Sequence, residues 1–494
     1  MNYTSTRGII KESVSSAYAI KTGLAADGGL FMPESIPSLT KEELTKLLSL
    51  GYEERAAEIL SKFLTDYTYE ELILDAKGAY AKEKFGDSPA PVTKLDESMY
   101  MLELWHGPTC AFKDMALQIM PRLFTRALKK CGENKTALIL VATSGDTGKA
   151  ALEGYKDIPG TKIKVFYPVD GVSRVQKLQM QTQEGNNLSV SGIVGNFDDA
   201  QSGVKKIFAD KQIKDALLED NVFLSSANSI NWGRLVPQIV YYVSAYCDMV
   251  NSGAISFGDK IDVCVPTGNF GNIFAGYIAK LMGLPIEKLV CASNVNNVLT
   301  DFLKTGIYNK NRDFHTTISP SMDILISSNL ERLLYVMLGS EKTAEYMRKL
   351  SAEGKYELTK EELEIINSSF VGYYTSEDET KKTIKNVYEN KNCLIDTHTA
   401  VAVYAAERYL SDSKAERKIL AVSTASPYKF ANDVFFSVFE RYPLDELSAL
   451  TELSALTKTE IPYPLSNLDK KEILHTEIID KCEMEDATFR IAKA

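Results

Sequence analysis

The stretch Leu102-Glu-Leu-Trp-His-Gly-Pro-Thr-Cys-Ala-Phe-Lys-Asp-Met-Ala-Leu-Gln118 decides how the rest of the chain is interpreted. It begins as an apolar strand, turns at Gly107-Pro108 and enters a helical pattern with Lys113 in the first turn. Cations are disfavoured at a helix N-terminus because the peptide dipoles place positive partial charge there. That charge and the apolar neighbours of Lys113 would lower the pKa of its amine and leave it partly neutral and nucleophilic. Taken alone, the stretch is also compatible with an ordinary surface lysine.

The composition is that of a globular protein. Of 494 residues, 25% are charged and 45% hydrophobic, and the length suggests about three domains. A net charge of -10 argues against a nucleic-acid partner. The N-terminus has no signal-peptide pattern, and no apolar run approaches the ~18 residues of a membrane span. Seven cysteines without a C-x-x-C pair and four scattered histidines predict reduced thiols and no metal site. We therefore expect a cytoplasmic protein.

Short apolar runs that end in polar, glycine-containing loops recur along the chain. Residues 136–142 lead into 143–149, residues 261–265 lead into 266–272, and residues 419–422 lead into 423–427. Further strands are predicted at 162–167, 222–225 and 289–292, with helices between them. Alternating strands and helices predict an α/β fold with parallel sheets, whose ligands bind at the carboxyl ends of the strands. The three junctions therefore predict one composite site.

Two glycine loops are candidate anion sites. Gly145-Asp-Thr-Gly-Lys149 is not a nucleotide-triphosphate loop, because position 143 is not glycine and position 150 has no hydroxyl. Gly268-Asn-Phe-Gly-Asn272 lets several N–H groups converge at a helix N-terminus, which suits one phosphate, although a plain turn and helix cap is the alternative. Ser229 and Arg234 form a second candidate, since arginine binds phosphate through paired hydrogen bonds; a salt-bridged surface arginine is the alternative.

Several motifs together resemble the threonine synthases, a family of fold-type II pyridoxal-phosphate enzymes. They are residues 106–114, 144–148, 266–272 and 27–33, with Ser5-Thr-Arg-Gly8 and Ser327-Ser-Asn-Leu-Glu-Arg332 also fitting. The resemblance extends to about residue 432 and points to the branch with an extended N-terminal domain. It implies a fold like the tryptophan synthase β subunit, with the site between two parallel-sheet domains.

We therefore expect four parts of the chain. They are an N-terminal helical domain at 1–95, a large pyridoxal-phosphate-binding α/β domain at 96–130 and 235–435, a small α/β domain at 131–234, and a C-terminal extension at 436–494. In the N-terminal part, helices are predicted over 41–64 and 70–85.

The resemblance also implies roles for individual residues. Lys113 would form the Schiff base with pyridoxal 5'-phosphate and carry protons, and Asp146 would lie near the phenolic oxygen and Thr424 at the pyridine nitrogen. The cofactor phosphate would be held by Gly268, Asn269, Phe270, Gly271 and Asn272. The substrate's own phosphate would be held by Thr143, Ser144, Thr147, Ser229 and Arg234. His106 and Thr109 would line the substrate cleft.

The implied reaction converts O-phospho-L-homoserine and water to L-threonine and phosphate by γ-elimination and β-hydration, the last step of threonine biosynthesis. Two alternatives stay open at this point. One is another fold-type II enzyme, such as a serine/threonine dehydratase or a cysteine synthase. The other is a non-catalytic, synthase-like binding protein. Either a monomer or a homodimer is compatible with the sequence.

Overall fold

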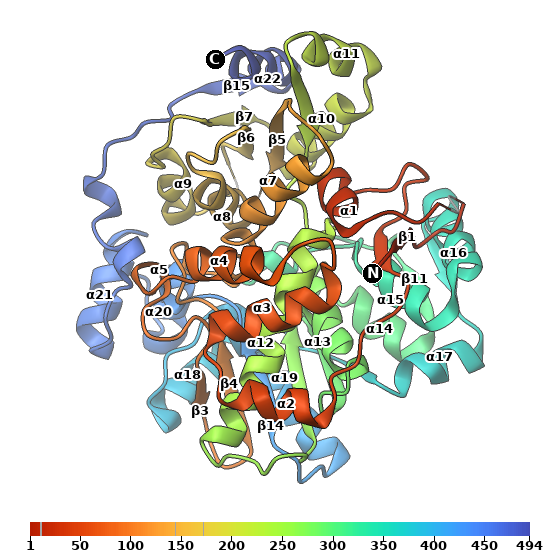
Figure 1. Cartoon of the computed structure of the whole chain (residues 1–494). Helices are drawn as coiled ribbons and strands as arrows, with labels where there is room; N and C mark the ends of the chain where they lie inside the picture. Colours follow the sequence, from red (N-terminus) through yellow and green to blue (C-terminus); the bar gives the residue numbers. More distant parts are fainter. Residues whose placement is uncertain (10–11, 144, 171) are drawn as a thin grey trace.

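Two large sheets organise the protein, as the computed structural model shows (Figure 1). The structure describes residues 1–9, 12–143, 145–170 and 172–494. The large sheet has the strand order β13-β10-β9-β14-β4-β3, with only β3 antiparallel to its neighbour. Its strands are β3 (Val92–Lys94), β4 (Met99–Glu103), β9 (Ile261–Pro266), β10 (Ile286–Ser293), β13 (Phe370–Tyr374) and β14 (Ile419–Ser423).

The small sheet is parallel throughout and has the order β15-β7-β6-β5-β8. Its strands are β5 (Thr136–Ala142), β6 (Thr161–Pro168), β7 (Leu188–Val194), β8 (Val222–Ser225) and β15 (Ile478–Asp480). Two short antiparallel pairs complete the strands: β1 (Tyr3–Ser5) with β2 (Phe31–Pro33), and β11 (Ile307–Asn309) with β12 (Lys355–Glu357).

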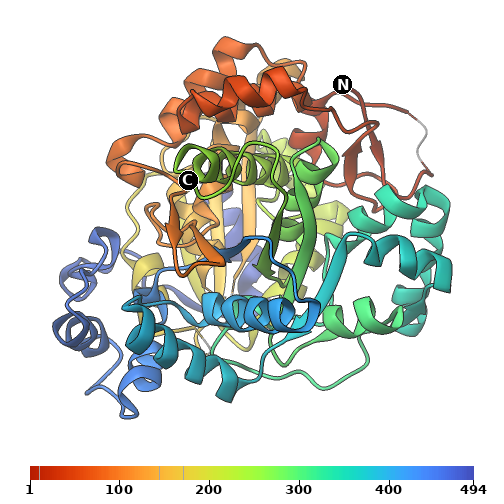
Figure 2. The same ribbon diagram turned by 90° about the horizontal axis from the view of Figure 1, so that it is seen from below.

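Both faces of the large sheet are buried, because successive side chains of a strand point to opposite faces. Val263 and Val265 pack with helices α12 (Trp232–Asn251) and α13 (Gly271–Leu281). Cys264 between them packs toward α18 (Glu377–Lys391), α19 (Thr397–Ser413) and α20 (Ala431–Phe439). Figure 2 shows α19 lying along its face of the sheet. This double burial explains why the strands are continuous apolar runs in the sequence.

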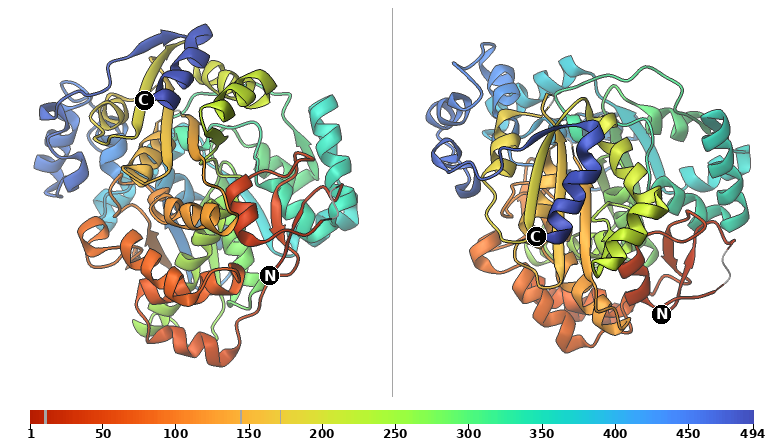
Figure 3. Two further views of the ribbon diagram at one scale, coloured as in Figure 1. Left: turned by 45° about the horizontal axis from the view of Figure 1, so that its top comes forward. Right: turned by 90° about the horizontal axis from the view of Figure 1, so that it is seen from above.

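The small sheet is covered in the same way. Its inner face packs on α7 (Met120–Lys130) and α8 (Asp146–Tyr155), and α9 (Arg174–Gln181) lies beside α8. Its outer face packs on α10 (Phe197–Ala209), α11 (Lys211–Glu219) and α22 (Met484–Lys493). The segment predicted as a C-terminal extension thus supplies both β15 and α22 to this sheet (Figure 3). Its first helix, α21 (Ser448–Thr457), packs instead on α20.

The remaining helices surround these layers. In the N-terminal part they are α1 (Ser16–Thr22), α2 (Lys41–Leu48), α3 (Tyr52–Phe63), α4 (Tyr69–Ala79) and α5 (Lys82–Phe85). In the middle of the chain they are α6 (Asp114–Leu117), α14 (Val298–Thr305), α15 (Leu330–Leu338), α16 (Ser340–Glu353) and α17 (Lys360–Asn367). Short 3-10 turns are η1 (Pro320–Met322), η2 (Pro427–Phe430), η3 (Tyr463–Leu465), η4 (Leu468–Lys470) and η5 (Lys481–Glu483). In the described part of the chain, none of the helices has the length and apolarity needed to cross a bilayer.

The α/β fold with a helical N-terminal part is confirmed, and strands β5 and β8 have the predicted bounds. Three predicted helices differ. The helix expected over 41–64 is two helices, α2 and α3, separated at residues 49–51. The helix expected over 70–85 is also two helices, α4 and α5, separated at residues 80–81. In the helical segment after the lysine, α6 begins at Asp114, so Lys113 is its N-cap residue rather than part of its first turn.

Candidate active site

The predicted site residues lie on loops and first helical turns that follow β4, β9, β14, β5 and β8. Strands β4, β9 and β14 are neighbours and parallel, so their carboxyl ends share one edge of the large sheet. The loop after β4 is fixed to the loop after β14: the Phe112 N–H donates to the Thr424 carbonyl at 2.8 Å, and Ala111 forms an antiparallel bridge with Ala425. The backbone therefore brings Lys113 next to Thr424.

Lys113 lies in a nearly dry environment between the two sheets. Its side chain is only 10% exposed, and its Nζ lies 3.3 Å from Ser321 Oγ and 3.5 Å from Asp146 Oδ2. Burial lowers the pKa of the Lys113 amine below its ordinary value; Asp146 opposes this shift, while the charges of Arg234 and Lys429 add to it. A partly neutral amine is what a nucleophilic lysine requires.

Asp146 is the first residue of α8. Its shorter ion pair is with Lys429, a residue that the sequence analysis did not identify. Lys429 Nζ, completely buried, lies 2.9 Å from Asp146 Oδ1, and Gln176 Nε2 donates to the same oxygen at 2.8 Å. Burial alone would raise the pKa of the Asp146 carboxyl, but the charges of Lys429 and Lys113 hold it well below its usual range. Asp146 is therefore ionised, and Lys429 is the closer of its two cations.

His398 and Asp396, which the sequence analysis did not identify, hold Ser321, whose hydroxyl contacts Lys113. The Ser321 N–H donates to His398 Nε2 at 3.1 Å, and His398 Nδ1 lies 2.8 Å from Asp396 Oδ2. Because Nε2 accepts a hydrogen bond, the proton of a neutral His398 is on Nδ1 and points at Asp396. This arrangement fixes η1, and with it the hydroxyl that contacts Lys113 Nζ.

The loop Gly268–Asn272 has the shape of an anion cradle at the start of α13. Phe270 has a φ of 61°, the left-handed conformation, and a Cβ on Gly268 would lie 2.7 Å from the Ser321 carbonyl oxygen, so this approach requires glycine. Tyr241 and Tyr242 hydroxyls both lie 2.6 Å from Asn272 Oδ1, while Asn272 Nδ2 is buried with no hydrogen-bond partner among the described residues. An unsatisfied buried donor here fits a phosphate oxygen.

The residues predicted to hold a second phosphate gather around the start of α12 and the loop after β5. Arg234 is buried, its Nη1 donates to the Ala227 carbonyl at 2.8 Å, and its Nε has no partner in the described part of the chain. Burial lowers the pKa of Arg234 to about 10, still fully charged at neutral pH. Ser229, half-buried, donates to Asn228 Oδ1 at 3.2 Å.

Thr143, one of the residues predicted to hold the substrate's phosphate, stabilises the backbone of the loop that follows β5. Thr143 Oγ1 accepts hydrogen bonds from the Gly145 and Gly148 N–H groups, at 3.0 and 2.9 Å. Thr147 is half-buried in the first turn of α8. Ser144 was predicted here too, but it lies outside the described residues.

His106 and Thr109, both predicted to line the substrate cleft, differ in how exposed they are. His106 is half-buried, stacks on Trp105 at 4.2 Å and places Nε2 2.8 Å from Glu103 Oε2. Thr109 is fully buried, and both its N–H and its hydroxyl donate to Asp114 at 2.8 and 2.7 Å. Burial raises the pKa of Asp114 to about 7, although these hydrogen bonds oppose the shift. Thr109 thus braces the turn before Lys113 instead of lining a cleft.

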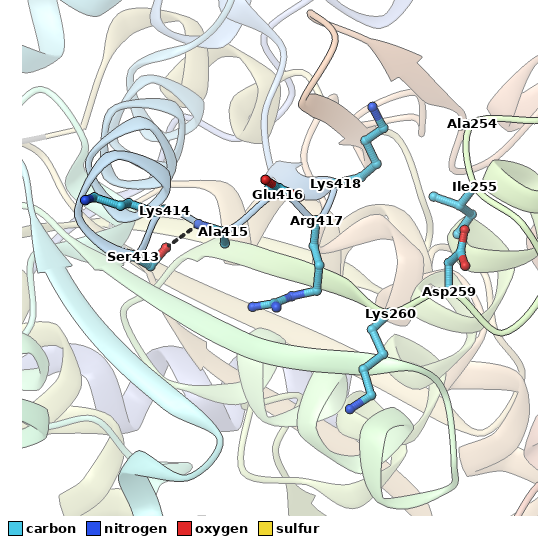
Figure 4. A pocket seen from close by; sticks show the side chains of 10 residues that line it. All are labelled: Ala254, Ile255, Asp259, Lys260, Ser413, Lys414, Ala415, Glu416, Arg417 and Lys418. Carbon is cyan, nitrogen blue, oxygen red and sulfur yellow. Dashed lines mark hydrogen bonds between the residues drawn. The ribbon is translucent and has the colours of Figure 1, made fainter.

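A wide surface hollow of about 650 Å³ lies at the opposite end of the large sheet (Figure 4). Lys260 and Lys418, which line it, directly precede β9 and β14, whereas the candidate site follows the far ends of these strands. Two of its cations are engaged locally: Lys260 pairs with Glu287 at 2.7 Å and Arg417 with Asp262 at 3.2 Å. The hollow is separate from the Lys113 site.

Comparison with known proteins gives consistent matches along the chain. The family profile "Threonine synthase N terminus" matches residues 2–80, and "Pyridoxal-phosphate dependent enzyme" matches residues 87–425. The threonine synthase of Saccharomyces cerevisiae is 36% identical over 92% of this chain and 93% of its own length. A crystal structure titled as PLP-bound threonine synthase from Brucella melitensis superimposes with a TM-score of 0.88 at 34% identity, covering 100% of both chains.

A further relative is longer than this chain. The human protein named Threonine synthase-like 1 is 38% identical over 95% of this chain, which spans 62% of that relative's length.

Proposed function

The chain belongs to the threonine synthase family of pyridoxal-phosphate-dependent enzymes, and we propose that it converts O-phospho-L-homoserine and water to L-threonine and phosphate. The observation that carries this proposal is a pair of buried donors, Asn272 Nδ2 and Arg234 Nε, that have no acceptor among the described residues, together with a lysine of lowered pKa. A buried donor left unsatisfied is costly, so each suits an anionic oxygen. A phosphorylated cofactor and a phosphorylated substrate together supply two such anions.

The residues present fit the cofactor. Its phosphate would bind the N–H groups of Gly268–Asn272 and Asn272 Nδ2, and Thr424 would offer a neutral hydroxyl to the ring nitrogen. Pyridoxal phosphate, when bound, supplies an aldehyde for covalent attachment and an electron-withdrawing ring that acidifies the substrate's α-carbon. The charge of Lys429 keeps the Asp146 carboxylate ionised. This carboxylate would accept a hydrogen bond from the Lys113 nitrogen.

Lys113 is the base that the site provides. Burial of its amine lowers its pKa and so favours the neutral form, which can accept a proton from a carbon acid. Ser321 Oγ and Asp146 Oδ2 lie on two sides of Nζ and restrict where it points. The His398–Asp396 pair in turn holds Ser321 in place. The Lys113 amine therefore has a defined position.

The assay that tests the proposal measures threonine and inorganic phosphate released from O-phospho-L-homoserine. We expect the two products in equal amounts and no detectable keto acid. A serine/threonine dehydratase would instead release ammonia and a keto acid from serine or threonine. A protein that holds pyridoxal phosphate but turns over none of these substrates would support the non-catalytic alternative and contradict the proposal.

Arg234 is expected to determine affinity for the phosphorylated substrate. Replacement of Arg234 by alanine removes a buried guanidinium whose Nε has no acceptor in the part of the chain that the structure describes, so the Michaelis constant for O-phospho-L-homoserine should rise about 100-fold. The visible absorption of the bound cofactor should be retained. Steady-state kinetics and an absorption spectrum of the same preparation check both statements.

Arg234→Lys serves as the control that keeps the charge but loses the planar fork. It should recover part of the affinity. Unchanged kinetics in Arg234→Ala would show that the substrate phosphate binds elsewhere.

A further inference from the structure

Arg332 is a completely buried cation that, within the described part of the chain, donates hydrogen bonds only to uncharged oxygens. It lies in the first turn of α15, its side chain has no exposed surface, and burial lowers the pKa of the guanidinium to about 9. Its donors reach three oxygens: Phe31 O at 3.2 Å, Ile230 O at 2.6 Å and Asn329 Oδ1 at 2.5 Å. The adjacent carboxylate of Glu331 is bound by Thr6 and Arg7. A buried charge without an ion pair is costly to retain, which calls for a compensating anion or a functional role.

Arg332 connects directly to the anion cradle through one amide. Asn329 accepts from Arg332 with its Oδ1 and donates with its Nδ2 to the Asn269 carbonyl at 3.0 Å. The Asn329 backbone N–H donates to that carbonyl too, at 3.0 Å. The guanidinium therefore sets the orientation of the Asn329 amide, and two donors of Asn329 then hold the carbonyl of the residue before Phe270, which has the left-handed conformation.

The other two contacts of Arg332 reach segments on different parts of the site. The Ile230 carbonyl belongs to the turn that carries Ser229 and precedes Arg234. The Phe31 carbonyl belongs to β2 in the N-terminal part of the chain. One side chain thus connects three segments: the loop Gly268–Asn272, through Asn329; the turn that carries Ser229; and β2 in the N-terminal part of the chain.

We propose that Arg332 is the positioning residue of the anion cradle, and that it favours a doubly charged phosphate there by fixing Asn329 under the loop and by placing a buried positive charge behind it. The inference rests on the proposed function, because the cradle's ligand is the cofactor phosphate. A purely structural arginine would stabilise the fold without discriminating between ligands with and without that phosphate. Selectivity for phosphate is therefore the property to measure.

The experiment compares two aldehydes on apoprotein freed of cofactor. Pyridoxal 5'-phosphate and pyridoxal share the ring and the aldehyde, but pyridoxal has a hydroxyl where the other has a phosphate. Each is titrated while the visible absorption band is followed. In Arg332→Gln we expect the dissociation constant for pyridoxal 5'-phosphate to rise about 30-fold and that for pyridoxal to change less than about threefold. Arg332→Lys, which retains charge without the fork, should lie between Arg332→Gln and the wild type.

Arg55→Gln is the matched control. Arg55 is also buried, at 4% exposure; it donates to the Leu47 carbonyl and Ser244 Oγ at 2.9 and 2.8 Å and, unlike Arg332, pairs with a carboxylate, Asp248, at 2.6 Å. It should lower stability without changing the ratio of the two dissociation constants.

Asn329→Ala keeps the inference testable if Arg332→Gln does not fold. It removes the amide that links Arg332 to the loop, and should weaken pyridoxal 5'-phosphate about tenfold with pyridoxal nearly unchanged. Equal weakening of both aldehydes in these variants, or none, would overturn the inference. A wild-type apoprotein that develops no band with pyridoxal 5'-phosphate would instead overturn the proposed function itself.

Discussion

Replacement of Lys113 by alanine is expected to abolish the visible absorption band and to lower turnover of O-phospho-L-homoserine by about 10⁴-fold or more. The reason is that Lys113 supplies both the covalent attachment and the base, and the amine beside Ser321 Oγ and Asp146 Oδ2 has a lowered pKa suited to both roles. Absorption spectra and steady-state kinetics measure the two losses. Added pyridoxal phosphate should not restore the rate.

Lys164→Met is the matched control for this substitution. Lys164, on β6, is also buried, with a side chain 1% exposed, and burial likewise lowers its pKa, but it pairs with Glu477 at 3.0 Å. Its loss should lower stability and leave the absorption band in place. An active Lys113→Ala protein would contradict the role assigned to this lysine.

Replacement of Lys429 by methionine is expected to reduce turnover by about 100-fold near neutral pH and to move the acid limb of its pH profile about one unit upward. Lys429 is the nearer cation to Asp146, at 2.9 Å against 3.5 Å for Lys113. Without it, the carboxylate pairs with Lys113 alone and a nearby positive charge is lost, so the pKa of the Lys113 amine rises. The amine works as a base only above its pKa, so activity is lost on the acidic side first.

The double variant Lys429→Met with Asp146→Asn separates charge from packing. It removes the buried carboxylate together with its partner, so the stability lost in the single variant, about 3 kcal/mol, should be largely recovered. The acid limb should also move back toward its original position, because Lys113 is no longer paired with an anion. A single variant with an unshifted pH profile would show that Lys429 does not set the protonation of Lys113.

The fold and the main site segments could be predicted from the sequence because the patterns that indicate them are local. Strands buried on both faces are continuous apolar runs, and β5 was predicted with the bounds that it has. Lys113 and the loop Gly268–Asn272 stood out by their local sequence, but each alone also fitted an ordinary surface lysine or a plain turn; their combination with Thr424 and the family motifs marked them as site segments. Strand β15 was not predicted, since its pairing with β7 joins residues almost 300 positions apart and leaves no local pattern.

The residues that tune the site were not recognisable for the same reason. Lys429 follows Thr424 by five positions in an apolar stretch, which is a weak signal, and its role depends on Asp146 at the start of α8, after β5 of the small sheet. Ser321 and His398 meet only through the folded chain. The catalytic and binding roles of all the predicted site residues, Lys113 included, stay predictions.

The most direct measurement of the central claim is to reduce the purified protein with borohydride and locate the modified residue by peptide mass spectrometry. We predict that the visible band disappears on reduction and that a single phosphopyridoxyl group is found on the peptide containing Lys113. The absence of any such group, or its presence on a different lysine such as Lys149 or Lys429, would contradict the account.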